Sequence, residues 1–180
     1  MKVTQTKLSG CLILQPTIHE DARGFFMESF NAKTFKESTG LVVSFVQDNY
    51  SQSSKGVLRG LHYQKLNPQG KLVSVTRGSV FDVAVDIRSD SPTLGCWVGV
   101  ELSEENKLQF WIPEGFAHGF VVTSDIADFQ YKCTNYYSPE DEASIHWQDS
   151  DLNISWPNDL EITVSSKDSK AQSFKSILKK

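Results

Sequence analysis

The 180-residue sequence predicts an all-β protein, a sandwich or barrel with short peripheral helices. Apolar and polar residues alternate with a period of two through the middle of the chain, which is typical of half-buried strands. The strand candidates recur at short spacing with turn residues between them, and helical periodicity is scarce. Many short strands without long helices are typical of a β-sandwich or β-barrel.

Two short helical segments are expected, one near each end. Asn31 is a candidate N-cap for a helix over residues 32–38. Phe174, Ile177 and Leu178 could form one apolar face of a terminal helical turn. The surrounding segment from about residue 165 to 180 is rich in Ser and Lys, and we expect it to be partly a polar tail.

The central strands show the clearest alternation. Residues 81–87 place Phe, Val, Val and Ile on one face and Asp82, Ala84 and Asp86 on the other. Val73 and Val75 lie at odd-numbered positions, as do the apolar residues of the 81–87 segment, on the other side of a turn at residues 77–79, so we expect a hairpin about that turn. Further strands are expected at residues 97–102, 108–112, 119–123 and 128–135, with turns at residues 91–92, 113–115 and 138–139.

Length and composition restrict the class of protein. We expect one domain over residues 1–180, a size that buries roughly 70% of the unfolded surface. A net charge of −4 argues against a general nucleic-acid binder. Three widely spaced cysteines indicate neither a disulfide framework nor a zinc knuckle and suit a reducing compartment. No apolar run is long enough for a signal peptide or a membrane span, so we expect a cytoplasmic protein.

The segment Arg59-Gly60-Leu61-His62-Tyr63-Gln64 places a cation and an imidazole within a predicted strand. Because the ordinary imidazole pKa of about 6.5 lies close to neutral pH, His62 is a candidate for proton transfer on an anionic substrate. The alternative is a histidine that only hydrogen-bonds within a sheet.

Residues 113–118 have the PxGxxH form of the second half of a cupin motif, which places His118 inside a barrel. A metal-binding cupin would normally offer two histidines two apart and a carboxylate before it. Here Gln64 follows His62, and Lys71 adds an ammonium group that opposes a dication. We therefore expect a cupin-type jelly-roll β-sandwich or barrel with no catalytic metal.

A series of segments resembles the dTDP-4-dehydrorhamnose 3,5-epimerase family of the cupin superfamily. The resemblance runs in order from about residue 10 to residue 170, and any one segment alone is weak. The matching segments are residues 21–28, 47–51, 57–64, 70–73, 82–88, 91–95, 112–120, 131–134 and 154–157.

The family resemblance implies a role for individual residues of this chain. His62 matches the proton acceptor, Tyr131 the proton donor, Asp168 the carboxylate that orients the histidine, and Lys71 the cation beside the keto oxygen. The positions that match ligand contacts are Gln47, Asp48, Asn49, Arg59, His118, Glu142 and Lys167. Arg23 and Glu28 match positions that reach the nucleotide across a homodimer interface, so the resemblance implies a homodimer with shared active sites.

These residue types suit epimerisation beside a carbonyl. The keto group acidifies the neighbouring C–H bonds, a base leaves an enolate, and an acid reprotonates its other face. An ammonium group in a dry pocket stabilises the enolate oxygen, and guanidinium groups suit a diphosphate. No electron leaves the substrate, so no cofactor is expected.

The resemblance thus implies conversion of dTDP-4-dehydro-6-deoxy-D-glucose to dTDP-4-dehydro-L-rhamnose. The open alternatives are an enzyme that epimerises only C3 or C5, a noncatalytic sugar-binding jelly roll, and a metal-dependent cupin enzyme.

Overall fold

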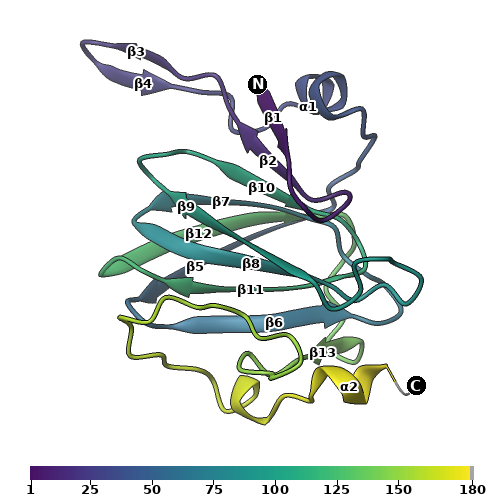
Figure 1. The fold of residues 1–180 in the computed structure, drawn as a ribbon. Helices are drawn as coiled ribbons and strands as arrows, with labels where there is room; N and C mark the ends of the chain where they lie inside the picture. The colour runs from purple at the N-terminus through teal and green to yellow at the C-terminus, as the bar shows by residue number, and fades with distance from the viewer. Residues whose placement is uncertain (179–180) are drawn as a thin grey trace.

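The computed structural model describes residues 1–178, which form two antiparallel β-sheets with a shared core and a small separate hairpin (Figure 1). The larger sheet has the order β1-β2-β10-β7-β12-β5. Its strands are β1 (Lys2–Gln5), β2 (Leu12–Gln15), β10 (Gln109–Ile112), β7 (Lys71–Arg77), β12 (Ile126–Cys133) and β5 (Gln47–Ser54). This arrangement confirms the predicted all-β jelly-roll class.

The second sheet has the order β13-β6-β11-β8-β9. Its strands are β13 (Glu142–Ser144), β6 (Leu58–Gln64), β11 (Phe116–Val122), β8 (Ser79–Asp86) and β9 (Trp97–Ser103). The remaining elements are the hairpin of β3 (His19–Asp21) and β4 (Gly24–Phe26), helices α1 (Ala32–Thr39) and α2 (Phe174–Ile177), and the 3₁₀ turn η1 (Asp168–Lys170).

The alternation along β8 sorts its side chains between two apolar clusters. Ala84 belongs to the core between the sheets, together with Val73 and Phe129 of the six-stranded sheet. Val83 and Val85 belong to a second cluster on the outer face of the five-stranded sheet, which the C-terminal segment covers. Both faces of β8 are therefore buried, and its alternation separates two cores rather than core from solvent.

The predicted hairpin about the turn at residues 77–79 is wrong. β7 pairs with β10 and β12, whereas β8 pairs with β9 and β11. The turn at residues 77–79 carries the chain from one sheet to the other. The alternation shows that Val73 and Val83 lie on apolar faces of their strands. It does not show whether the two strands are hydrogen-bonded neighbours or lie in facing sheets.

Helix α1 confirms the predicted helix and its cap. The Asn31 side chain accepts hydrogen bonds from the backbone N–H groups of Lys33 and Thr34. The helix ends at Gly40, whose φ of 75° is the left-handed conformation that glycine adopts without a Cβ penalty. Phe35 is fully buried against Leu12 and Trp111, so α1 covers part of the six-stranded sheet.

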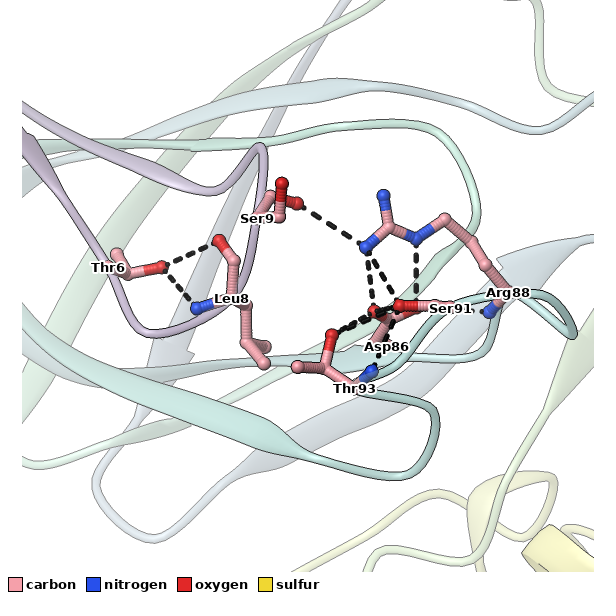
Figure 2. A network of polar contacts seen from close by, with 7 residues as sticks. All are labelled: Thr6, Leu8, Ser9, Asp86, Arg88, Ser91 and Thr93. Carbon is pink, nitrogen blue, oxygen red and sulfur yellow. Dashed lines mark hydrogen bonds and ion pairs between the residues drawn. The ribbon is translucent and has the colours of Figure 1, made fainter.

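A fully buried carboxylate ties β8 to two loops (Figure 2). Asp86 accepts hydrogen bonds from the Arg88 guanidinium at 2.7 and 2.9 Å and from the hydroxyls of Ser91 and Thr93, both at 2.6 Å. Arg88 also donates to the carbonyl of Ser9 at 3.3 Å, in the loop between β1 and β2. This cluster joins the N-terminal loop to the β8–β9 connection.

The C-terminal segment, expected to be partly a polar tail, packs against the five-stranded sheet. Asp168 and Phe174 are buried, and the terminal helical turn is present as α2. No helix within residues 1–178 is long and apolar enough to cross a membrane. At the other end of the chain, the β3–β4 hairpin projects away from the sheets, with Phe25 and Phe26 exposed (Figure 1).

Candidate active site

Two glycines let β6 and β11 approach closely where the candidate base lies. A Cβ on Gly60 would come within 2.5 Å of the Gly119 Cα, and Gly60 has a φ of 138°. A Cβ on Gly119 would come within 2.8 Å of the Arg59 carbonyl oxygen. Just beyond this contact, His62 and His118 are paired across the two strands.

His62 forms a hydrogen-bonded pair with Asp168. The His62 Nε2 lies 2.6 Å from the Asp168 Oδ1, and the side chains are 30% and 4% exposed respectively. Burial alone would raise the pKa of Asp168, but its hydrogen bond and charge interaction with His62 lower it. An ionised Asp168 favours a proton on Nε2, which leaves the Nδ1 lone pair free to accept a proton.

His118 forms a second, deeper pair. Its Nε2 lies 2.9 and 3.0 Å from the two carboxylate oxygens of Asp82, and Asp82 is fully buried. Burial lowers the pKa of His118, while Asp82 opposes that shift and the charges of Lys71 and His62 add to it. These directions favour a neutral His118, which lies opposite His62 on the neighbouring strand.

The facing sheet contributes Lys71 and Tyr131. The Lys71 ammonium lies 5.9 Å from the centroid of the Tyr131 ring. Burial lowers the pKa of Lys71, and the carboxylates of Asp82 and Glu142 partly offset that shift. Burial also raises the pKa of Tyr131 to about 12, with the Arg59 guanidinium opposing the rise. Tyr131 is therefore a neutral phenol at ordinary pH, able to donate a proton.

Further charged side chains lie near the strands that carry His62 and Tyr131. Glu142 forms an ion pair with Lys167 and accepts a hydrogen bond from the Tyr137 hydroxyl at 2.5 Å. Arg59 donates to the Ser53 hydroxyl at 3.0 Å. A cleft of about 350 Å³ runs between β6 and the C-terminal segment. Its lining residues include Arg59, His62, Lys167 and Asp168.

The three consecutive ligand-contact candidates on β5 do not share a face. The Gln47 amide donates to Asn49 at 2.9 Å, and Asn49 donates to the Cys133 sulfur at 3.5 Å. The Asp48 side chain instead pairs with Lys132 at 2.9 Å, and it is 70% exposed. Because successive side chains of a strand point to opposite faces, only the backbone of Asp48 shares the environment of its neighbours.

Arg23 and Glu28 lie on and just after the projecting hairpin, and their contacts there are local. The Arg23 guanidinium pairs with Asp21 at 2.6 Å and is 89% exposed. Glu28 accepts a hydrogen bond from Asn31 at 2.6 Å. Within residues 1–178, neither side chain forms a hydrogen bond or ion pair with the residues around His62.

The sequence interpretation missed Asp82 and Tyr137 as parts of the site. Asp82 could have been identified from the sequence, since it is a charged residue on the same face of β8 as Ala84, which lies in the core between the sheets. Nothing in the polar loop around Tyr137 identifies that residue as part of the site. Within residues 1–178, no three histidine, cysteine or acidic side chains gather in a way that could hold a metal ion.

Comparison with known proteins gives a match along almost the whole chain. The family model described as dTDP-4-dehydrorhamnose 3,5-epimerase matches residues 5–176. The chain is 58% identical over 172 residues to a protein of that name from Salmonella typhimurium, a match that covers 95% of this chain and 94% of the relative.

Solved structures match equally well. The structure of dTDP-6-deoxy-D-glucose-3,5-epimerase from Legionella pneumophila, in complex with dTDP-4-keto-L-rhamnose, is 57% identical with a TM-score of 0.95. The match covers 98% of this chain and 94% of that one. A 3′-monoepimerase from Streptomyces bikiniensis, in complex with dTDP-quinovose, is 33% identical with a TM-score of 0.91 and coverage of 97% and 88%. The fold therefore occurs in both kinds of epimerase, and the 3,5-epimerases from Salmonella typhimurium and Legionella pneumophila are more similar to this chain than the monoepimerase is.

Proposed function

This chain belongs to the dTDP-4-dehydrorhamnose 3,5-epimerase family, and from that premise we propose how its residues act. The chain is an isomerase that epimerises C3 and C5 of dTDP-4-dehydro-6-deoxy-D-glucose to give dTDP-4-dehydro-L-rhamnose. The observation that supports its acid–base chemistry is the pair of His62 and Asp168 on one wall, with Lys71 and Tyr131 on the facing sheet.

His62 serves as the base, through Nδ1. With Nε2 bound to Asp168, the free nitrogen can take the acidic proton beside the keto group. Asp168 then stabilises the imidazolium that forms. General acid–base catalysis contributes roughly 10²–10⁴-fold, so the site must also stabilise the enolate.

Lys71 supplies that stabilisation, and Tyr131 completes the epimerisation. The carboxylates of Asp82 and Glu142 oppose the effect of burial on the Lys71 pKa and so help Lys71 keep its proton. An ammonium group beside the developing enolate oxygen makes an electrostatic contact that is much stronger in a buried site than in water. The Tyr131 phenol reprotonates the carbanion from the face opposite His62. Arg59 and Lys167 bind the diphosphate, while Gln47, the Asp48 backbone, Asn49, His118 and Glu142 hold the sugar and nucleoside.

The reaction can be followed directly in D₂O. Purified protein is incubated with dTDP-4-dehydro-6-deoxy-D-glucose, without added metal or nicotinamide, and NMR reads deuterium at C3 and C5. We expect deuterium and inversion at both carbons. Incorporation at one carbon only would make the enzyme a mono-epimerase. Absence of incorporation, with nucleotide binding intact, would leave the sugar-binding alternative.

A homodimer with shared active sites is the second part of the proposal. The β3–β4 hairpin carries Arg23 away from its own barrel and exposes Phe25 and Phe26, which are 56% and 67% accessible. Two large exposed rings on a projecting hairpin suit burial against a second subunit. Arg23 and Glu28 then reach the nucleotide of the neighbouring subunit.

Complementation between two inactive variants tests this sharing. Arg23→Ala and His62→Ala are mixed, dissociated and reassociated. In a mixed dimer one site carries both changes and the other carries neither. Random pairing makes about half the dimers mixed, so about a quarter of parental activity should return. Verified mixed dimers without activity would refute shared sites, provided that Arg23→Ala alone is inactive.

A cytoplasmic location is also part of the proposal. Cys11, Cys96 and Cys133 are all free thiols, which suits the cytoplasm. The division into one domain over residues 1–180 stays a prediction.

A further inference from the structure

The carboxylate that binds His62 does not come from a strand of either sheet. Asp168 begins the short turn η1, in a segment whose Thr163 pairs with Val57 just before β6. Before it, Thr163 is tied to the barrel, since its N–H donates to Gly56 at 2.9 Å and its carbonyl accepts from Leu58 at 2.8 Å. The Asp168 N–H also donates to the Ser165 hydroxyl at 3.0 Å, and the segment has a second attachment on the C-terminal side of Asp168.

That second attachment is made through Asp149, a buried residue with no contact to His62. Its Oδ2 accepts the N–H of Phe174 at 2.9 Å, while its Oδ1 accepts the N–H groups of Asp151 and Leu152 at 3.0 and 3.3 Å. One carboxylate thus joins the loop after β13 to the chain just beyond η1.

Packing reinforces the same junction. The Phe174 ring lies over Gly95, where an added Cβ would come within 3.0 Å of the ring. Phe174 is 7% exposed and belongs to the cluster that covers the five-stranded sheet. Nearby, the His146 N–H donates to the Gln172 carbonyl at 2.8 Å. The turn that carries Asp168 is thus fixed at both ends.

We propose that Asp149 and Phe174 form a latch that positions Asp168 and thereby sets the tautomer of His62. They are positioning residues, since neither touches the reacting atoms. The kinetic part of this inference rests on the proposed role of His62 as the base. The tautomer part does not, because it concerns only which ring nitrogen carries the proton.

The variant Asp149→Asn tests the latch. An amide has one acceptor oxygen, so it can serve Phe174 or the two loop amides but not both, and its NH₂ group then faces a donor. The matched control is Lys175→Ala. Lys175 lies in α2 next to Phe174, and the substitution removes its ion pair with Asp151. Phe174→Ala disturbs the latch by packing alone and serves if Asp149→Asn does not fold.

The first readout is the tautomer of His62 in substrate-free protein. The chain has only four histidines, so ¹⁵N-histidine labelling gives few resonances, and His62→Gln identifies the relevant pair. The parental protein and the Lys175→Ala control should show neutral His62 protonated on Nε2. Asp149→Asn or Phe174→Ala should show a mixture with the Nδ1-protonated form. A folded latch variant with the parental tautomer would overturn the inference.

The second readout is a double-mutant cycle with Asp168→Asn. Asp149→Asn should lower kcat about tenfold with little change in KM, since small misplacements of a catalytic group cost up to roughly 10²-fold. In the Asp168→Asn background the same change should cost less than about twofold, because both act through one carboxylate. Equal losses in both backgrounds would refute the latch. A parental protein without turnover would refute the proposed function and leave the tautomer test intact.

Discussion

The substitution Asp86→Asn should destabilise the fold without touching the active site. Asp86 is fully buried and accepts four side-chain hydrogen bonds from Arg88, Ser91 and Thr93, as well as the N–H of Arg88 at 3.1 Å (Figure 2). Asparagine keeps the shape of the side chain, removes the charge and replaces one acceptor oxygen with a donor. The Arg88 guanidinium then loses its only carboxylate partner recorded within residues 1–178.

The size of the loss follows from the burial of each partner. Removing one member of a buried ion pair costs roughly 3–5 kcal/mol. The Arg88 side chain is 30% exposed and can reach water, which places the expected loss at about 3 kcal/mol, the lower end of that range. For a chain of this size, about 3 kcal/mol corresponds to a fall in Tm of roughly 6–12 °C.

The loss should depend on pH in a defined direction. Burial alone would raise the pKa of Asp86, but its hydrogen bonds from Arg88, Ser91 and Thr93 outweigh burial and hold that pKa below its ordinary value. A depressed folded-state pKa contributes stability that is complete above the unfolded-state pKa of about 3.9 and is lost as pH falls below it. The difference between the two proteins should therefore be constant from pH 7 to 5 and should narrow below pH of about 4.

Urea unfolding at a series of pH values measures this difference. Ser91→Ala is the matched control, since it removes one hydroxyl donor from the same carboxylate and should cost only about 1 kcal/mol. The cluster does not stabilise the fold as described if the free energy of unfolding of Asp86→Asn lies within about 1 kcal/mol of the parental value at pH 7. The same holds if the difference between the two free energies does not become smaller in acid.

Three further predictions concern the active site. His62→Ala should abolish turnover but leave nucleotide affinity nearly unchanged by calorimetry, and turnover within a few-fold of the parent would show that another group is the base. Arg59→Ala should weaken binding of the diphosphate ligand by about 2 kcal/mol, or roughly 30-fold, the lower end of the range for a charge pair, because Arg59 is exposed. An equal loss for thymidine would mean that Arg59 supports the strand instead. Because the Tyr131 pKa is about 12, kcat of the parental protein should show no alkaline fall from loss of this donor below pH of about 10, and a fall with a midpoint at about pH 9 would contradict this expectation.

The strands were predictable from the sequence because their alternation is local. Asn31 likewise marked the start of α1, since an N-cap acts on the next few residues. The sheet to which a strand belongs was not predictable. Val73 and Val83 both lie at odd-numbered positions on either side of a turn, yet β7 and β8 lie in different sheets. The alternation could not show this, because both faces of β8 are buried and the pattern does not identify the inner face.

The candidate site shows a similar division. His62, Lys71 and Tyr131 could be proposed because the family resemblance covers the segments that carry them. The burial of Asp168 could not be predicted, since its Ser-Lys-Asp-Ser surroundings read as solvated chain. Its position depends on a contact with His62, which is more than 100 residues away in the sequence. Likewise, the separation of Asp48 from Gln47 and Asn49 depends on which face of β5 lies inward.

Isotope exchange in Tyr131→Phe tests most directly the claim that a base and an acid act from opposite sides of the sugar. In D₂O, His62 should still remove a proton, exchange it with solvent and return deuterium to the same face. We therefore expect deuterium in the substrate with its configuration retained, and no exchange in Tyr131→Phe combined with His62→Ala. Inversion at the parental rate in Tyr131→Phe, or exchange that survives the loss of His62, would contradict the assignment of the two groups.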